Sequence, residues 1–197
     1  MPGGIRARMP TGISGEPELT RFICNPLSGQ LFRLPDIDGT TMTLRYPNVG
    51  ILTQSERPDQ PPDKYAVAGL SISQDRSFVM RRFLSQTGKW DMLAGLPSPL
   101  PLARRMDMGV PHEAVAFAGR LWWFDVTCGA LSVDPFSDRP ELRVVELPRS
   151  SVTKQVDREK CWDLGKYRRM GVSAGRMRYA EVSQVGPFLL SSFTLYT

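Results

Sequence analysis

The stretch that decides the fold lies in the second half of the chain and reads RLWWFDVTCGALSV at residues 120–133. Residues alternate on a period of two over Arg120–Thr127, Cys128-Gly129 supplies a turn, and Ala130–Val133 continue as an apolar run. Such alternation is typical of β-strands, whose successive side chains point to opposite faces of a sheet. The stretch therefore predicts two antiparallel strands, with a third at Leu142–Leu147.

The same plan of strand, glycine turn, strand and Leu-Pro occurs twice earlier in the chain. In the first, apolar runs at Thr20–Cys24 and Gln30–Leu34 flank the turn formers Asn25–Gly29. In the second, an apolar run at Ser77–Leu84 is followed by Gln86-Thr87-Gly88 and by a further run that begins at Trp90. Gly, Pro, Asn and Ser favour turns, so both places predict hairpins. Leu-Pro pairs close the three units at residues 34–35, 96–97 and 147–148.

A second internal similarity relates Ala118–Trp123 to Ala174–Tyr179, and both segments predict a turn entering a strand. Repeated short strands are typical of propeller blades, because each small sheet buries its faces against neighbouring sheets. The sequence thus predicts a mainly β fold with a propeller-like arrangement of short antiparallel sheets, a partial propeller, with a β-sandwich as the alternative. Helix is expected only around Val156–Trp162, unless Ser151–Tyr167 is a solvated connection.

The chain has 197 residues, which fits one domain. Prolines and glycines in residues 1–19 predict a flexible N-terminal tail, and residues 20–197 a single β-rich domain. The predicted core consists of strand residues that alternate with polar or small neighbours: Phe22, Phe32, Val79, Val115, Phe117, Leu121, Trp123, Val133, Val144, Val182 and Leu189.

The composition limits the choice of cellular compartment and argues against membrane-spanning proteins. No window of about 18 consecutive apolar residues occurs, so no membrane-spanning helix and no membrane partner are expected. Cys24, Cys128 and Cys161 are odd in number and widely spaced, which favours a reducing compartment, the cytoplasm or nucleus. Arg6 and Arg8 precede the first acid, as in a mitochondrial transit peptide, but the nearby prolines oppose its amphipathic helix.

No pattern in the sequence predicts a catalytic, cofactor or metal site. Gly171–Gly175 matches the Gly-x-Ser-x-Gly nucleophile elbow, but Arg176–Val182 alternates like a strand where a helix should follow, and His112 precedes Ser173. His112 is also the single histidine, and three scattered cysteines offer no spaced pair for zinc. Phosphate-binding glycine loops are absent. We therefore expect a protein that is not an enzyme.

The positive charge is concentrated in one segment, Arg149–Arg178, which has nine basic and three acidic residues, a balance of +6. Interleaved Trp162, Tyr167 and Tyr179 could stack bases, and the charge could neutralise phosphates or attract an acidic protein. The residues expected to bind a partner, with Arg168 and Arg169 expected to be exposed, are Arg158, Lys160, Trp162, Lys166, Arg168, Arg169, Arg176 and Arg178.

Three motifs identify a family resemblance. The turn Cys24–Gln30 with Leu34-Pro35, the strand Ala118–Asp125 and the hairpin Gly171–Tyr179 resemble the grass-expanded plant family called domain of unknown function 1618. The likeness extends over most of Phe22–Leu195, and the turns are also similar to those of F-box-associated and kelch-like propellers. The resemblance implies a fold and supplies no catalytic residues. It also implies that the chain is clipped at both ends, which would leave open sheet edges for another chain.

These observations predict an interaction module of a plant cell that binds another protein through exposed sheet edges and the basic segment, which would suit an acidic partner. Edge strands would also allow oligomers. A nucleic-acid-binding protein that uses residues 149–178 is the first alternative, and an enzyme of unidentified activity is the second.

Overall fold

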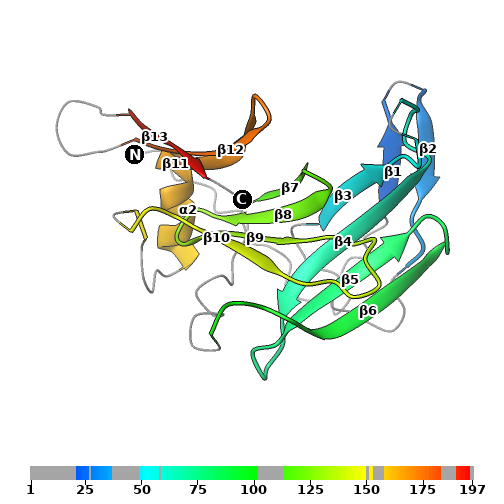
Figure 1. The fold of residues 1–197 in the computed structure, drawn as a ribbon, viewed down its shortest axis with the longest axis horizontal. Helices are drawn as coiled ribbons and strands as arrows, with labels where there is room; N and C mark the ends of the chain where they lie inside the picture. Colours follow the sequence, from blue (N-terminus) through cyan, green and yellow to red (C-terminus); the bar gives the residue numbers. More distant parts are fainter. Residues whose placement is uncertain are drawn as a thin grey trace, which may run out of the picture. The chain divides into compact units, whose positions relative to one another are not determined.

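The computed structural model describes residues 21–26, 28–36, 49–57, 59–101, 113–149, 151–152, 158–182 and 190–195, with backbone alone for 158–162 and 190–195. The predicted tail boundary at residue 19 lies outside the described residues. The chain divides into two compact units, Met1–Arg45 and Tyr46–Thr197, and each is described by itself. Figure 1 shows the strands and the helix in the order of the chain.

The described part of the first unit contains a β-hairpin. Strand β1 (Phe22–Asn25) pairs antiparallel with β2 (Gln30–Arg33), and the turn is closed by the Gly29 amide, which donates to the Asn25 carbonyl at 2.9 Å. Gly29 has a φ of 69°, which suits glycine. The hairpin predicted from this turn is confirmed.

In the second unit, the first sheet has the order β3-β4-β5-β6 and comprises β3 (Val49–Gln54), β4 (Lys64–Ile72), β5 (Phe78–Leu84) and β6 (Lys89–Leu96). All neighbouring strands pair antiparallel. The predicted turn at residues 86–88 joins β5 to β6. Near its end β6 has a bulge, because Val79 pairs with Ala94 whereas Phe78 pairs with Leu96, which leaves Gly95 as the extra residue.

The middle sheet has the order β10-β9-β8-β7 and comprises β7 (Glu113–Phe117), β8 (Arg120–Asp125), β9 (Gly129–Val133) and β10 (Arg143–Glu146). The strands predicted from RLWWFDVTCGALSV are thus confirmed as β8 and β9, and the third as β10. Gly129 begins β9 with a φ of 147°, and a Cβ there would lie 2.1 Å from the Val145 carbonyl oxygen. Only glycine lets β10 approach the turn this closely.

The last sheet follows α2 (Arg158–Tyr167) and has the order β11-β12-β13, with β11 (Arg168–Ser173), β12 (Arg176–Val182) and β13 (Leu190–Leu195). The helix ends five residues later than the sequence predicted, so Ser151–Tyr167 is not wholly a solvated connection. Its last turn contains Lys166, whose charge favours a helix C-terminus.

The internal similarity between the middle and last sheets corresponds to one backbone turn used twice. Ala118 and Gly119 have φ values of 50° and 71°, and Ala174 and Gly175 have 50° and 65°. Two successive positive φ values are those of a type I′ hairpin turn, whose twist matches the strands that it joins. Both segments are therefore turns entering strands, as predicted. Ser173 ends a strand and is followed by another strand, so the context of a nucleophile elbow is missing.

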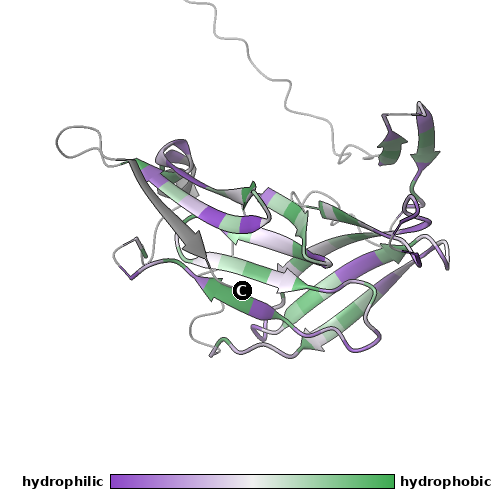
Figure 2. Ribbon diagram, turned by 45° about the horizontal axis from the view of Figure 1, so that its top comes forward, coloured by the Kyte–Doolittle hydropathy of each residue, from purple (hydrophilic) through white to green (hydrophobic). Residues whose placement is uncertain are grey.

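The core is formed by both faces of the middle sheet. Leu121 and Trp123 of β8 belong to a buried cluster with residues of the first sheet such as Met80, whereas Trp122 and Phe124 belong to a second cluster with residues of the last sheet. Figure 2 shows apolar residues distributed along the strands of these sheets. The prediction of a mainly β chain of several short antiparallel sheets is confirmed, and none of the sheets described closes into a barrel.

The leucines of the three Leu-Pro pairs, Leu34, Leu96 and Leu147, are all buried. Each follows or ends a strand, and the proline after it cannot donate a ladder hydrogen bond. Leu96 and Leu147 belong to the two buried clusters, so these two Leu-Pro pairs anchor the chain in a core and end the strand at the same place.

The predicted core is only partly correct. Leu121, Trp123 and Val133 are buried, whereas Val79, Val115, Phe117, Val144 and Val182 are partly buried. The prediction was wrong for Phe22 and Phe32, which are 53% and 52% exposed, because the two-stranded hairpin has no second layer among the described residues of its unit. Leu189 lies outside the described residues.

Removal of Trp123 tests the first buried cluster. Trp123 is 2% exposed, so Trp123→Ala should lower the free energy of unfolding by roughly 3–5 kcal/mol, as large aromatic deletions in cores do. Met92→Ala is the control, because Met92 is 60% exposed and should cost little. Urea denaturation measures both variants, and equal stabilities would contradict the assignment.

The close approach at Gly129 gives a second stability test. Gly129→Ala should destabilise the protein by clearly more than Gly88→Ala, for which only the φ of 66° costs about 1 kcal/mol because no atom lies within 4 Å of the added Cβ. Thermal and urea denaturation of the two variants give the comparison. Similar losses of stability in the two variants would show that β10 can move away from residue 129 at Val145 at little cost.

Candidate interaction surface

The structure separates the residues of the predicted basic segment into three groups. Arg158, Lys160 and Trp162 lie on α2, and their side chains are outside the described part. Lys166 is exposed, and its Nζ lies 2.7 Å from Oδ1 of Asp163, a surface ion pair. On the last sheet, Arg168 is buried, and three arginines are exposed: Arg169, Arg176 and Arg178.

The expectation that Arg168 is exposed was wrong. It stands opposite Glu181 in the register of β11 and β12, and its Nη2 and Nε lie 2.9 and 3.2 Å from Glu181 Oε1. Its Nη1 donates to the Val126 carbonyl at 3.1 Å, just beyond β8. Arg168 therefore points inward and links the last sheet to the middle sheet. A buried guanidinium needs such partners, because an unpaired charge is costly in the interior.

The other oxygen of Glu181 completes this buried network. Oε2 accepts hydrogen bonds from Ser151 Oγ at 2.7 Å and from the Tyr179 hydroxyl at 3.0 Å. Burial opposes ionisation of Glu181, but the hydrogen bonds from Ser151, Tyr179 and Arg168 outweigh it and hold the pKa of this carboxyl below its ordinary value. Burial raises the pKa of Tyr179 to about 12, so its hydroxyl stays protonated.

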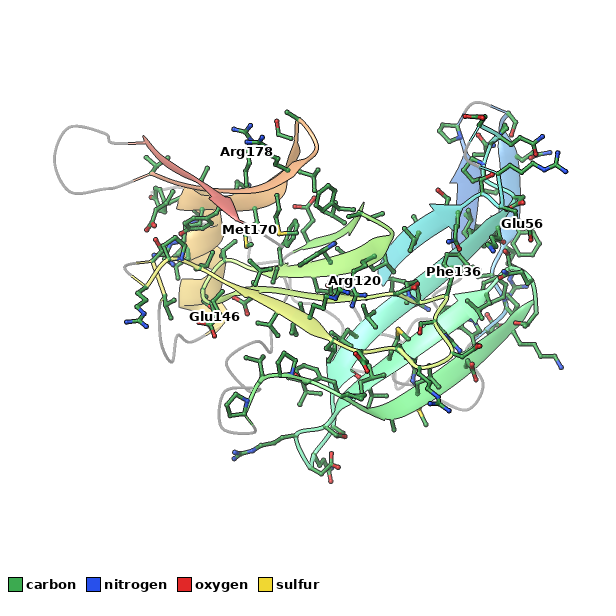
Figure 3. All side chains as sticks on the ribbon, in the orientation of Figure 1. Glu56, Arg120, Phe136, Glu146, Met170 and Arg178 are labelled. Atoms are coloured by element: carbon green, nitrogen blue, oxygen red, sulfur yellow. The ribbon has the colours of Figure 1, made fainter. Side chains whose placement is uncertain are left out.

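The exposed arginines share the outward face of the last sheet. Directly opposite residues lie on the same face, and β12 pairs the buried Met177 and Tyr179 with Val172 and Met170 of β11. Arg176 and Arg178 alternate with these and point outward, opposite Ser173 and Gly171, and Arg169 lies outward opposite Ala180. Figure 3 shows Arg178 and Met170 on opposite sides of this sheet. We call the outward residues Arg169, Arg176 and Arg178 the basic face.

The basic face carries uncompensated charge. Its described positions on β11 and β12 contain no acidic residue, and no ion pair joins Arg176 or Arg178 to any other described residue. Arg169 is held in place, because its Nη1 donates to the carbonyls of Gly165, at the end of α2, and Arg168. The face is thus positive, exposed and partly pre-ordered.

The positions of β11 and β12 on this face also carry no aromatic residue. Besides the arginines they are Gly171, Ser173, Ala180 and Val182, and β13 places Thr194 and Ser192 opposite Arg178 and Ala180. Tyr179, one of the three aromatics that the sequence interleaved with the charge, is fully buried and bonded to Glu181, so it cannot stack a base. Tyr167 is 41% exposed at the end of α2, and the Trp162 side chain lies outside the described residues.

Two of the outer sheet edges are poor templates for another strand. The edge strand β6 carries the bulge at Gly95, and the edge strand β10 has four residues with Arg143 and Glu146 at its ends. Bulges, short lengths and charges are the usual protections of an edge. Both edges are therefore protected against pairing with another strand.

Other candidate chemistry has little support in the described part of the chain. His112 lies outside it, no group of three or more potential metal ligands occurs within it, and Cys24 is an exposed free thiol. No helix there is long and apolar enough to cross a membrane.

Sequence reasoning missed Glu181, because the basic segment was taken to end at residue 178. The signal exists in the sequence as an acid on the same strand as Arg176 and Arg178. Its use requires the register of the hairpin, which sets Glu181 opposite Arg168 and not opposite Arg169.

Loss of Arg168 should destabilise the fold, whereas loss of an outward arginine should not. Breaking a buried pair costs roughly 3–5 kcal/mol, and we expect Arg168→Met near the lower end because the Glu181 side chain is 26% exposed. Arg176→Met, on the basic face, should stay within about 0.5 kcal/mol of the parent. Urea denaturation at neutral pH measures both variants. An unchanged free energy of unfolding in Arg168→Met would contradict the network.

The same network predicts an acid-sensitive stability. Since the pKa of Glu181 is lower in the folded state than in the unfolded state, its contribution is present above the unfolded pKa and is lost as the pH falls through the folded pKa. Glu181→Gln should therefore flatten the loss of unfolding free energy below about pH 5. The exposed acid Glu113, changed to Gln, is the control, and identical pH profiles for Glu181→Gln and the parent would refute the assignment.

Comparison with known proteins gives one match. Residues 123–194 match the model of a family described as protein of unknown function (DUF1618), which confirms over this part of the chain the resemblance indicated by the motifs. The match runs from within β8 to within β13 and so includes the basic face and the buried network. No curated protein and no solved structure matches the chain significantly.

Proposed function

We propose that this chain, which carries the domain of unknown function 1618 over residues 123–194, is a protein-interaction module that binds an acidic protein through its basic face. The observation that supports the proposal is the set of three exposed arginines on one sheet face, whose positions on β11 and β12 contain no acid. Charge complementarity steers encounter and selects partners more than it adds affinity.

A protein partner is favoured over nucleic acid by what the basic face lacks. Proteins that bind single strands combine positive charge with aromatic platforms. On β11 and β12 the positions of the face are glycine, alanine, serine and valine besides the arginines, and Tyr179 points into the core. The face can attract phosphates, but it offers no described side chain on which a base could stack.

The remaining parts of the proposal rest on the sequence. The cysteines of the sequence are odd in number and widely spaced, which supports a reducing compartment, so we place the module in the cytoplasm or nucleus. The plant origin follows from the family resemblance. A partial propeller is our preferred order of the sheets, because β3 and β7, the first strands of the first and middle sheets, lie against each other. We expect no catalytic activity.

Charge reversal on the basic face tests the proposal. Arg176→Glu with Arg178→Glu changes the net charge from +5 to +1, and Lys89→Glu with Arg143→Glu makes the same change at the exposed edge strands β6 and β10. Fluorescence anisotropy with labelled poly-L-glutamate measures binding. The first double variant should bind at least about tenfold more weakly, a loss of about 1.4 kcal/mol, and the second should bind nearly as the parent does.

Two outcomes would contradict this function. Equal losses in the two double variants would mean that poly-L-glutamate responds to net charge and not to the basic face. Tighter binding of single-stranded oligo-thymidine than of poly-L-glutamate at the same salt concentration, with a steep salt dependence, would favour the nucleic-acid alternative.

A further inference from the structure

The three charges of the basic face are evenly spaced along β12. Arg176 and Arg178 are two residues apart on one strand, which separates their Cα atoms by roughly 6.8 Å. Arg169 lies opposite Ala180 and is therefore level with the next outward position of β12, displaced sideways by one strand spacing of about 4.8 Å. Along the strand direction, a positive charge thus recurs at every second residue over three positions.

An extended peptide has the same repeat. Its side chains alternate between two sides, so residues i, i+2 and i+4 face one surface at intervals of about 6.8 Å. Carboxylates at these positions would each meet one arginine, and the planar guanidinium forks pair well with carboxylates. An arginine side chain is long enough to cover the sideways offset of Arg169, which would exchange the bonds of its Nη1 to the Gly165 and Arg168 carbonyls for bonds to the carboxylate.

The small residues between the three arginines, which we call the floor of the basic face, permit the close approach of another chain. Gly171 stands opposite Arg178 and two residues from Arg169 on β11, and no atom lies within 4 Å of the position that a Cβ would occupy there. Ser173 and Ala180 add only small side chains. A glycine in a strand often marks a place where another backbone comes near. No positive φ requires glycine at residue 171.

We propose that the basic face binds an extended acidic segment of the partner protein whose carboxylates recur at every second residue, with its backbone passing over Gly171. This inference rests on the proposed function and names the conformation and pattern of the ligand. Charge complementarity selects the acidic residues, the spacing of the arginines selects their repeat, and the small floor admits the backbone.

Two twelve-residue peptides with the same composition and charge test the repeat. One alternates Glu and Thr, and the other repeats Glu-Glu-Thr-Thr, so that in an extended chain its acids face one side only at every fourth residue. We expect the alternating peptide to bind at least about fivefold tighter, because three charge-assisted pairs form together. Isothermal titration calorimetry with the full chain gives the two affinities.

Variants test the role of the open site at Gly171 and of the planar guanidinium of Arg178. Gly171→Val should keep or raise the melting temperature, because the site is open and valine favours strands, but should abolish the preference for the alternating peptide. Ala116→Val, at an exposed position of β7, is the matched control and should leave the preference intact. Arg178→Lys keeps the charge and loses the fork, so it should weaken the alternating peptide by about threefold or more and the other peptide less.

The outcomes separate this inference from the proposed function. If both peptides bind equally and the Arg176→Glu, Arg178→Glu protein binds neither, the basic face binds acids without regard to their repeat, and only the inference falls. If neither the peptides nor poly-L-glutamate bind, the proposed function falls as well. If Gly171→Val retains the full preference, the backbone does not pass over residue 171, and the inference is overturned.

Discussion

Burial of both faces of β8 is the constraint on which the second unit depends. The alternation of this strand sends Leu121 and Trp123 into one cluster and Trp122 and Phe124 into the other, so a single strand contributes to two cores. The last sheet is packed against the second cluster through Met177 and Tyr179 of β12. Because a strand has only two sides, burial of these residues forces Arg176 and Arg178 outward. The basic face is thus a consequence of how the core is built.

Buried polar groups then fix how neighbouring sheets meet. Arg168 reaches the Val126 carbonyl from the last sheet, and Arg82 of β5 donates to the carbonyls of Pro135 and Ser137 after β9. Apolar contacts are not directional, so they tolerate small shifts between two sheets. A guanidinium that must satisfy several donors is far less tolerant, because a shift leaves a buried charge without its partners. These arginines therefore define positions that the apolar clusters alone would leave loose.

The sequence predicted strands, turns and hairpins well, but not which side chains of a strand are buried. Turns such as Asn25–Gly29 and Ala174-Gly175 are recognisable because glycine, proline and asparagine act within a few residues. The roles of Arg168 and Arg169 could not be assigned in this way. They are neighbours of the same type, and which one is buried depends on the register that sets Glu181, thirteen residues away, opposite Arg168. The prediction that Phe22 and Phe32 are buried failed for a related reason, since an apolar pattern indicates a strand but does not show whether a second layer covers it.

The buried network and the basic face are linked through the hairpin of β11 and β12. Arg168 and Arg169 are consecutive, so the bond from Arg168 to Glu181 sets the position of β11 along β12 and with it the distance from Arg169 to Arg178. A surface that recognises a repeat of charges needs that distance to be constant, because one residue of slippage would turn Arg169 to the inner face. Arg176 and Arg178 have no ion pair with another described residue that could supply this order. The ionised Glu181, held by three neighbours below the surface, provides the order that a recognition function of the outward arginines requires.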